Sequence, residues 1–193
     1  MPRDDPSSRG TPVFGRRSSP ARGMVQWRDR IVVTDPDPTE ENRVSAPQTL
    51  MYAEDLVVGD RIGLGTHTVG EDELVDFARS WDPQWFHTDR DAAASGPFGS
   101  LIASGIHTLA VAQRLTVDAA YGRWAVIAGR QLRQVRFLSP VLPGTTLTGT
   151  YVIDDVTLDD RGRGLVTATV TLVDDAGSAV LDGVVESYVR RRS

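Results

Sequence analysis

The stretch FGSLIASGIHTLAVAQRLTVDAA, residues 98–120, decides the fold class of this 193-residue chain. Apolar and small side chains fill almost every position, and the stretch predicts one helix from about residue 98 to residue 119. A helix that is apolar nearly all round is buried inside its own domain. The polar residues His107, Gln113 and Arg114 interrupt the apolar run, so it does not fit a membrane-spanning helix.

The sequence after about residue 124 alternates between apolar and polar side chains. In LVTATVTLV (165–173) the aliphatic residues face one side and the threonines the other, which is typical of a half-buried antiparallel strand. Further strands are predicted at TLTGTYVIDDV (146–156) and AVLDGVVESYVRR (179–191), with DDAGS (174–178) as a hairpin turn. A long helix followed by antiparallel strands is an α+β order, and it predicts a sheet wrapped around the helix.

Two shorter elements precede the long helix. RIGLGTHTV (61–69) is predicted to form a strand. Apolar residues then recur at helical spacing and predict a helix over residues 70–80, with Thr68 and Glu71 as a capping box at its start. Pro83 ends this helix, because the residue before a proline is disfavoured in the α region.

The N-terminal segment, residues 1–48, differs from the rest in composition. It is rich in Arg, Ser, Pro and Gly and has no apolar period, so it cannot bury enough surface to offset its ordering entropy. We expect a disordered extension, or a start codon placed too early, since Met24 and Met51 offer later starts. Residues 49–193 are expected to form the folded domain.

Composition excludes several classes of chemistry. The chain has no cysteine, which excludes disulfides, thiolate catalysis and cysteine-bound zinc. All 21 basic residues are arginine, so Schiff-base chemistry is also excluded. The three histidines are not spaced like a metal site, and the net charge of −5 argues against a general nucleic-acid binder.

The densest polar cluster is WDPQWFHTDRDAA, residues 81–93. Asp82 and His87 are separated by four residues, and Pro83 forces a turn between them. A carboxylate and an imidazole on one loop can converge on the same water or substrate proton, which suits general acid–base catalysis. The spacing alone also fits a helix end followed by an ordinary loop histidine.

A second candidate is Gly105, which follows Ser104 early in the long helix. Its uncovered backbone amide near a helix N-terminus could stabilise a developing oxyanion. Close packing of the helix on the sheet would equally explain a glycine there. A third element, RFLSPVLPGTTL (136–147), indicates by itself only a rigid turn that leads into a strand.

Taken in order, the three elements resemble the MaoC-like hydratase/dehydratase family, the (R)-specific enoyl-CoA hydratases of the hotdog fold. The resemblance covers roughly residues 52–192 and rests on Asp82, His87, DAAASGPFG, IASGIH and RFLSPVLPGTTL. Gly105 follows His87 by 18 residues, which is the family's spacing. Three positions depart from the family's pattern: Trp85 replaces a proline, Thr145 an aspartate and Gln113 a serine.

The resemblance implies a mechanism without a metal or redox cofactor. Gly105 N–H would polarise the thioester carbonyl of a trans-2-enoyl-CoA. Asp82 would take a proton from water, and His87 would orient the water or deliver a proton to Cα. The side chains of Trp85, Phe86, Ser104 and His107 are the candidate substrate contacts; a satisfied polar group near the helix is the alternative for His107.

The expected partners are an acyl-CoA or acyl-carrier thioester and a second copy of the chain in a homodimer, with no nucleic acid and no membrane. Arg130, Arg133 and Arg136 could meet the CoA phosphates, or they could form a solvated strand face. The expected location is the cytoplasm. Two other functions remain open: a hotdog thioesterase with its carboxylate elsewhere on the long helix, and a non-catalytic subunit that binds acyl thioesters.

Overall fold

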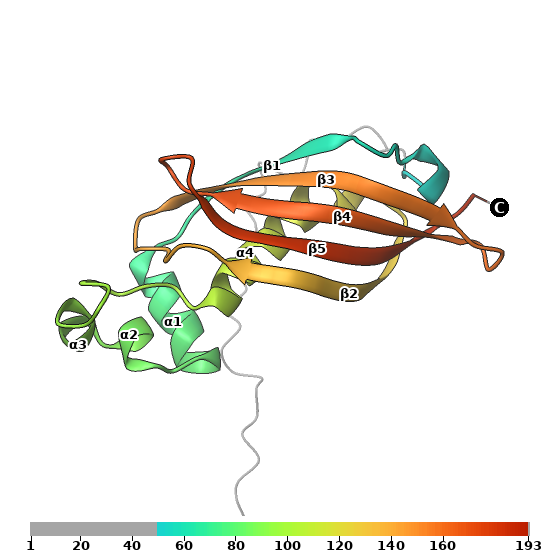
Figure 1. Cartoon of the computed structure of the whole chain (residues 1–193). Coiled ribbons are helices and arrows are strands. Elements are labelled where there is room, and N and C mark those ends of the chain that lie inside the picture. Colours follow the sequence, from blue (N-terminus) through green and yellow to red (C-terminus); the bar gives the residue numbers. More distant parts are fainter. Residues whose placement is uncertain (1–49, 193) are drawn as a thin grey trace, which may run out of the picture. The chain divides into compact units, whose positions relative to one another are not determined.

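The computed structural model describes residues 50–192, and the predictions for residues 1–48 lie outside this part of the chain. Its helices and strands follow one another in a helix-then-strand order, apart from the first strand (Figure 1). In chain order they are β1 (Arg61–Thr68), α1 (Glu71–Trp81), α2 (Trp85–Thr88), α3 (Arg90–Ala94), α4 (Gly105–Ala119), β2 (Val126–Phe137), β3 (Thr146–Leu158), β4 (Arg163–Val173) and β5 (Ala179–Arg190).

The five strands form one antiparallel sheet in the order β1-β3-β4-β5-β2. The sheet curves over α4, while α1, α2 and α3 lie together beyond the N-terminal end of α4 (Figure 1). The predicted α+β class, with an antiparallel sheet around one long helix, is confirmed.

The alternation predicted for the strands is confirmed where it was most regular. In β4 the side chains of Val166, Ala168, Val170 and Leu172 are buried, and the threonines between them are half-buried. The turn after β4 is the predicted hairpin, in which Asp174 N–H donates to the Ser178 carbonyl over 2.9 Å. One buried face fixes the register of such a strand, because a shift by one residue would expose the whole apolar set.

The long helix begins later than predicted. Residues 101–104 are not helical, although all four are buried. In this segment Ile102 N–H donates to the Phe86 carbonyl over 3.2 Å, and Ala103 N–H donates to the Val141 carbonyl over 2.8 Å. Ser104 then caps α4, since its hydroxyl accepts from Ile106 N–H over 3.2 Å. A serine side chain that bonds to a nearby backbone N–H favours a helix start over a position inside the helix. The helix therefore begins after Ser104 and does not extend back to residue 98.

Burial of α4 also differs from the prediction of a helix buried nearly all round. One face, with Val111, Ala112 and Leu115, packs against the sheet. The opposite stripe, with Ile106 and Val117, is exposed. A single sheet covers only one face of a helix, so the apolar residues of the other face are left on the surface.

The predicted helix over 70–80 is confirmed as α1, but its cap is not Thr68. Thr68 belongs to β1, where its hydroxyl lies 3.0 Å from that of Thr146. Gly70 is the N-cap, and its N–H donates to the Glu73 carboxylate over 3.4 Å. The helices α2 and α3 were missed, because four and five residues are too few to show a helical period.

The sheet core gives a stability prediction from two leucines of the same strand. In β3, Leu147 is 0% exposed and Leu158 is 43% exposed. Leu147→Ala leaves a cavity and should lower the free energy of unfolding by about 2–5 kcal/mol, measured by urea denaturation. Leu158→Ala is the control and should cost less than about 1 kcal/mol. Equal losses in the two variants would contradict the placement of the core.

Candidate active site

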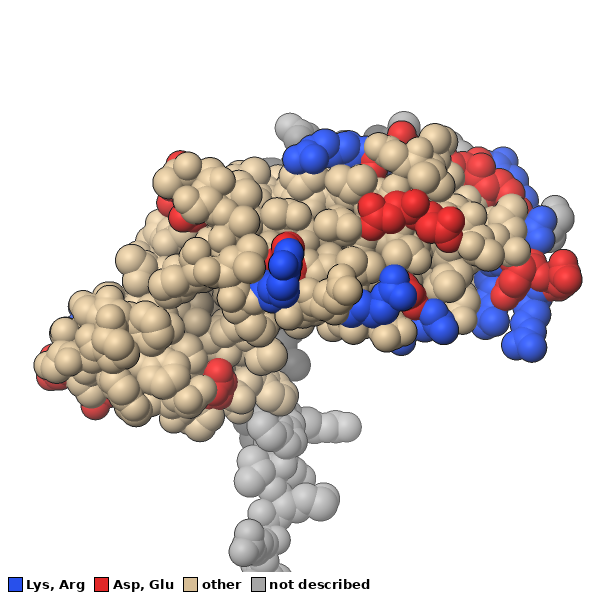
Figure 2. Space-filling view, viewed as in Figure 1, with Lys and Arg blue, Asp and Glu red and all other residues tan. Residues whose placement is uncertain are grey.

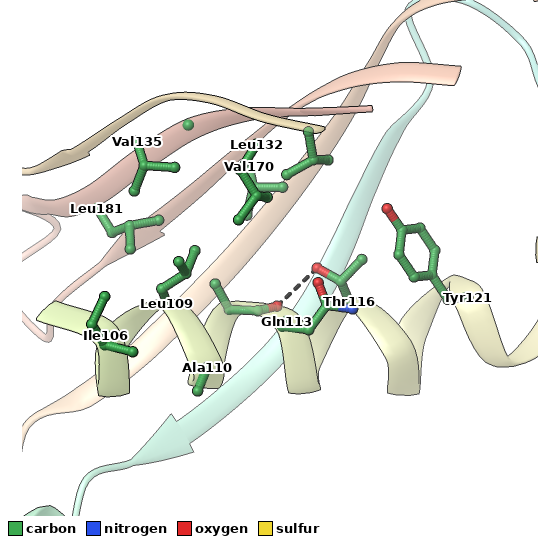
Figure 3. A pocket seen from close by; sticks show the side chains of 13 residues that line it. Ile106, Leu109, Ala110, Gln113, Thr116, Tyr121, Leu132, Val135, Val170 and Leu181 are labelled. Atoms are coloured by element: carbon green, nitrogen blue, oxygen red, sulfur yellow. Dashed lines mark hydrogen bonds between the residues drawn. The ribbon is translucent and has the colours of Figure 1, made fainter. Parts of the chain in front are cut away.

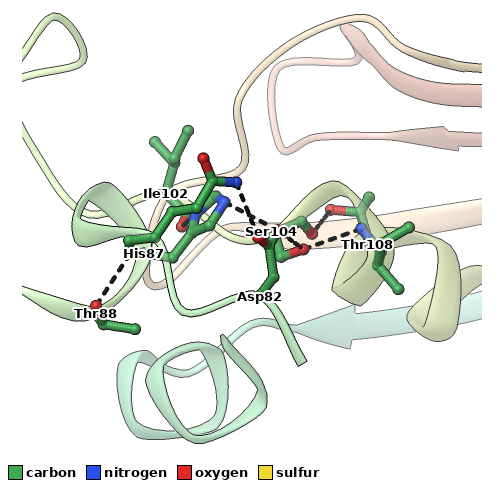
Figure 4. Close-up of polar contacts among 8 residues, drawn as sticks. Asp82, His87, Thr88, Ile102, Ser104 and Thr108 are labelled. Carbon is green, nitrogen blue, oxygen red and sulfur yellow. Dashed lines mark hydrogen bonds and ion pairs between the residues drawn. The ribbon is translucent and has the colours of Figure 1, made fainter. Parts of the chain in front are cut away.

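The structure brings Asp82 and His87 together. Asp82 is the C-cap of α1, which ends where Pro83 predicts, and His87 lies in α2. His87 Nε2 is 3.4 Å from Asp82 Oδ2 (Figure 4). The His87 side chain is only 5% exposed, so this contact lies largely out of bulk water.

A backbone carbonyl fixes which nitrogen of His87 can react. His87 Nδ1 lies 2.7 Å from the Ile102 carbonyl oxygen. A carbonyl oxygen only accepts hydrogen bonds, so Nδ1 carries a proton in either charge state. Nε2 is therefore the position that gains or loses a proton, and it faces the Asp82 carboxylate.

Two neutral donors hold the Asp82 carboxylate. The Ser104 hydroxyl donates to Oδ2 over 2.7 Å, and the Gln84 amide donates to Oδ1 over 2.8 Å. These hydrogen bonds, Ser104 first, keep the pKa of Asp82 below its ordinary value. Hydrogen bonds to a charged group favour the charged form, so Asp82 is a carboxylate near neutral pH.

Ser104 has a different position from the one expected for a substrate contact. Its side chain is fully buried. The hydroxyl donates to Asp82 while it accepts from Ile106 N–H, so both of its roles are taken up inside the protein. Ser104 thus positions Asp82 against the first turn of α4.

Gly105 and His87 line one cavity of about 270 Å³. Gly105 is the first residue of α4, and within residues 50–192 its N–H has no hydrogen-bond acceptor. A donor at the N-terminus of a helix attracts negative charge. This amide can therefore donate to an oxygen of a molecule bound in the cavity.

The other three predicted substrate contacts do not line this cavity. The Trp85 indole lies over Gly96, where an added Cβ would be 2.7 Å from the ring. The Phe86 ring lies between Trp85 and His87, with its centroid 4.4 Å from that of His87. Trp85 and Phe86 therefore pack against the loops next to the candidate site and do not enter the cavity.

His107 points away from the cavity, toward α1. It stacks on Phe77 with ring centroids 4.6 Å apart, and its Nε2 is 3.0 Å from Glu73 Oε1. His67 Nε2 lies 2.9 Å from the same oxygen. Burial raises the pKa of Glu73, but the hydrogen bonds from His107 and His67 outweigh it and leave the pKa lowered. Glu73 thus links β1, α1 and α4 rather than serving the cavity.

Sequence reasoning missed several apolar residues that do line the cavity, among them Phe98, Phe137 and Leu138. Phe137 and Leu138 stand inside the RFLSPV stretch, and Phe98 stands in GPFG. Both stretches were recognised, but nothing in a local pattern tells which side chains turn toward a distant helix.

The arginines of β2 already have carboxylate partners. Arg130 and Arg133 bond to Glu186, and Arg136 bonds to Asp182 over 2.8 Å. In Figure 2 the arginine side chains of the visible face lie beside acidic ones rather than in a separate patch. These three arginines therefore fit a solvated strand face better than a binding site for the CoA phosphates.

Within residues 50–192, no three His, Asp or Glu side chains are arranged to hold a metal ion. None of the described helices has the length and apolar character that a membrane span needs.

The family model for the MaoC-like domain matches residues 44–176. This chain belongs to the MaoC-like domain family. It is 38% identical over 136 residues to 3-hydroxyacyl-thioester dehydratase Z of Mycobacterium tuberculosis. The match covers 68% of this chain and 89% of that protein.

Solved structures confirm the hotdog fold of this MaoC-like chain. The crystal structure of the MaoC-like dehydratase from Rhodospirillum rubrum has a TM-score of 0.68 and 32% identity, over 74% of this chain and 99% of that one. The (R)-hydratase from A. caviae has a TM-score of 0.60 and 22% identity, over 72% and 99% of the two chains.

The hydrogen bond from Ser104 gives a prediction for this MaoC-like domain. Ser104→Ala should raise the pKa of Asp82, as measured by carboxyl NMR titration, because the strongest donor is lost. It should also cost about 1 kcal/mol of stability through the lost helix cap. Because folding lowers this pKa, the carboxylate stabilises the fold above its unfolded pKa and ceases to do so as pH falls through the folded value.

The matched control is Ser104→Thr, which keeps the hydroxyl and should leave the pKa of Asp82 low. An unchanged pKa in the alanine variant would show that Ser104 does not hold the carboxylate.

Proposed function

We propose that this MaoC-like domain is a hydratase/dehydratase that acts on enoyl and 3-hydroxyacyl thioesters, with acyl-CoA as the first substrate to test. The observation that carries the proposal is the convergence of three groups. His87 and Gly105 line one cavity, and the Asp82 carboxylate contacts His87 Nε2. The names of its relatives, a 3-hydroxyacyl-thioester dehydratase and a MaoC-like dehydratase, support the same reaction.

Gly105 would act on the thioester carbonyl. When water adds to C3 of an enoyl thioester, negative charge develops on the carbonyl oxygen as the enolate forms. The Gly105 N–H, which has no acceptor within residues 50–192 and belongs to a residue of the cavity wall, would stabilise this charge. The dipole at the start of α4 adds to the effect.

Asp82 and His87 would handle the proton as a unit. A water that contacts both His87 Nε2 and Asp82 Oδ2 from the side of the substrate would lose a proton to this pair while its oxygen bonds to C3. The pair then returns a proton to C2, which completes the addition, and dehydration runs through the same steps in reverse. Because the two groups are 3.4 Å apart, a proton can pass from one to the other without a change in the fold.

The thioesterase alternative places its carboxylate on the long helix. All of α4 lies within the described residues, and Asp118 is its only carboxylate. Asp118 stands near the C-terminal end of α4 and is bonded to Arg114 over 2.7 Å. The cavity lies at the opposite end of α4, so this observation favours the hydratase over the thioesterase.

The catalytic pair can be tested by substitution. Asp82→Asn and His87→Ala should each lower the rate of crotonyl-CoA hydration by at least about 100-fold, followed by loss of enoyl absorbance. The double variant should fall little further, because the two groups act together. Asp76→Asn in α1, an exposed aspartate, is the control and should retain activity. Independent, multiplying losses would refute a shared role.

We also propose that the chain forms a homodimer. β2 is an edge strand of 12 residues, and its Ile127 and Leu132 are exposed. The apolar stripe of α4, with Ile106 and Val117, is exposed as well. Open strand edges and exposed apolar stripes favour association with a second copy.

Light scattering at micromolar concentration should give the mass of a dimer. A lysine on the open edge disfavours strand pairing, so Ile127→Lys should shift the mass toward the monomer. A monomeric wild-type protein would contradict the proposal.

A further inference from the structure

Both ends of α1 are joined to the start of α4. At the C-terminal end of α1, the hydroxyl of Ser104, the cap of α4, donates to the Asp82 carboxylate over 2.7 Å (Figure 4). In the first turn of α1, the Glu73 carboxylate lies 3.0 Å from Nε2 of His107, the third residue of α4. The mechanism proposed above uses the first of these contacts and gives the second no role.

The imidazole of His107 is held by one face of α1. A carboxylate only accepts hydrogen bonds, so His107 Nε2–H is the donor to Glu73. The ring also stacks on Phe77, which follows Glu73 by four residues and therefore lies on the same face of α1. The His107 side chain is only 5% exposed, so both contacts are largely shielded from water.

Stability of the core does not explain why a histidine occupies this position. His107 Nδ1 is buried and has no hydrogen-bond partner within residues 50–192. A buried polar atom without a partner destabilises a fold, and a leucine could pack on Phe77 without that cost. The imidazole is therefore better explained by the bond that Nε2–H makes to Glu73 than by its packing.

The rest of α4 faces the sheet. Leu109 and Thr116 line the space between this helix and the strands, opposite Val170 of β4 and Leu181 of β5 (Figure 3). The sheet thus fixes α4, and the contacts at the start of α4 place α1 against it. Because Asp82 is the C-cap of α1, a shift of α1 would move this carboxylate.

We infer that Glu73 and His107 are positioning residues, whose hydrogen bond holds α1 against α4 and so keeps the Asp82 carboxylate in its place beside His87. This inference rests on the proposed function, which makes Asp82 catalytic. Neither positioning residue lines the cavity. Loss of their bond should therefore lower kcat and leave KM nearly unchanged.

A second hydrogen bond of Glu73 supplies a matched control. His67 of β1 lies 2.9 Å from the same carboxylate oxygen that His107 contacts. The bond from His67 runs to the sheet and not to α4. His67→Ala therefore removes one hydrogen bond from Glu73 and keeps the one on which the inference depends.

The first test is the pKa of Asp82, measured by carboxyl NMR titration of the folded protein. In His107→Leu this pKa should rise toward its ordinary value, because α1 shifts and the hydrogen bond from Ser104 weakens. His107→Gln keeps a side-chain N–H donor near the position of Nε2 and should keep the pKa low. His67→Ala should also keep it low. A general loss of stability would not move this pKa while the protein stays folded.

Crotonyl-CoA hydration gives the second readout. His107→Leu should lower kcat at least about tenfold, because a displacement of about 1 Å at a catalytic group can cost about 100-fold in rate. KM should stay within about twofold of the wild-type value, since the cavity wall is unchanged. His107→Gln and His67→Ala should retain most of the wild-type kcat.

The same bond can be removed from the side of Glu73. The Glu73 side chain is 40% exposed and alanine favours a helix, so Glu73→Ala should fold even if His107→Leu does not. It should match His107→Leu in both readouts. The double variant should lose no more than either single variant, because both changes remove one interaction.

Three results would overturn the inference. The first is an Asp82 pKa that stays low, or an unchanged kcat, in Glu73→Ala or in folded His107→Leu. The second is an equal loss in His67→Ala, and the third is no recovery in His107→Gln. If the wild-type protein hydrates no enoyl thioester, the proposed function is wrong, and the titration of Asp82 alone decides whether the pair positions it.

Discussion

The hydrogen bond from the Ser104 hydroxyl to Asp82 Oδ2, 2.7 Å long, connects the two segments on which the candidate site depends. The first is the loop after α1, which carries Asp82. The second is the start of α4, which Ser104 caps and from which the Gly105 amide projects. One buried hydroxyl therefore sets the carboxylate against the helix N-terminus. His87 joins the arrangement through the Ile102 carbonyl, two residues before the cap.

Much of the fold could be predicted from local pattern, because a half-buried strand displays its two faces in the sequence. The residues Val166 to Leu172 do so without exception. The start of α4 could not be predicted in this way, since Leu101, Ile102 and Ala103 are as apolar as the helix that follows. In the structure, Ile102 and Ala103 donate to the carbonyls of Phe86 and Val141 instead of to a preceding helical turn. These partners are distant in sequence, so a local pattern does not reveal them.

The candidate site, like the fold, could be predicted only in part. Asp82 and His87 are close in sequence, so their spacing could suggest a shared role. The partner of Ser104, Asp82, lies 22 residues away at the C-cap of α1, and the partner of His107, Glu73, lies 34 residues away in α1. Ser104 and His107 were expected to touch substrate because they flank Gly105, but side chains at successive helix positions point in different directions. Phe137 was missed for a related reason, since the stretch RFLSPV was recognised while the direction of its side chains depends on tertiary packing.

The central claim is that Asp82, His87 and Gly105 add water across an enoyl thioester rather than cleave the thioester or merely bind it. Incubation of crotonyl-CoA with the protein in D2O, followed by proton and deuterium NMR, tests this claim most directly. The account predicts an intact CoA thioester with a new hydroxyl at C3 and one solvent deuterium at C2. Release of free CoA thiol with crotonate, or recovery of unchanged crotonyl-CoA, would contradict it.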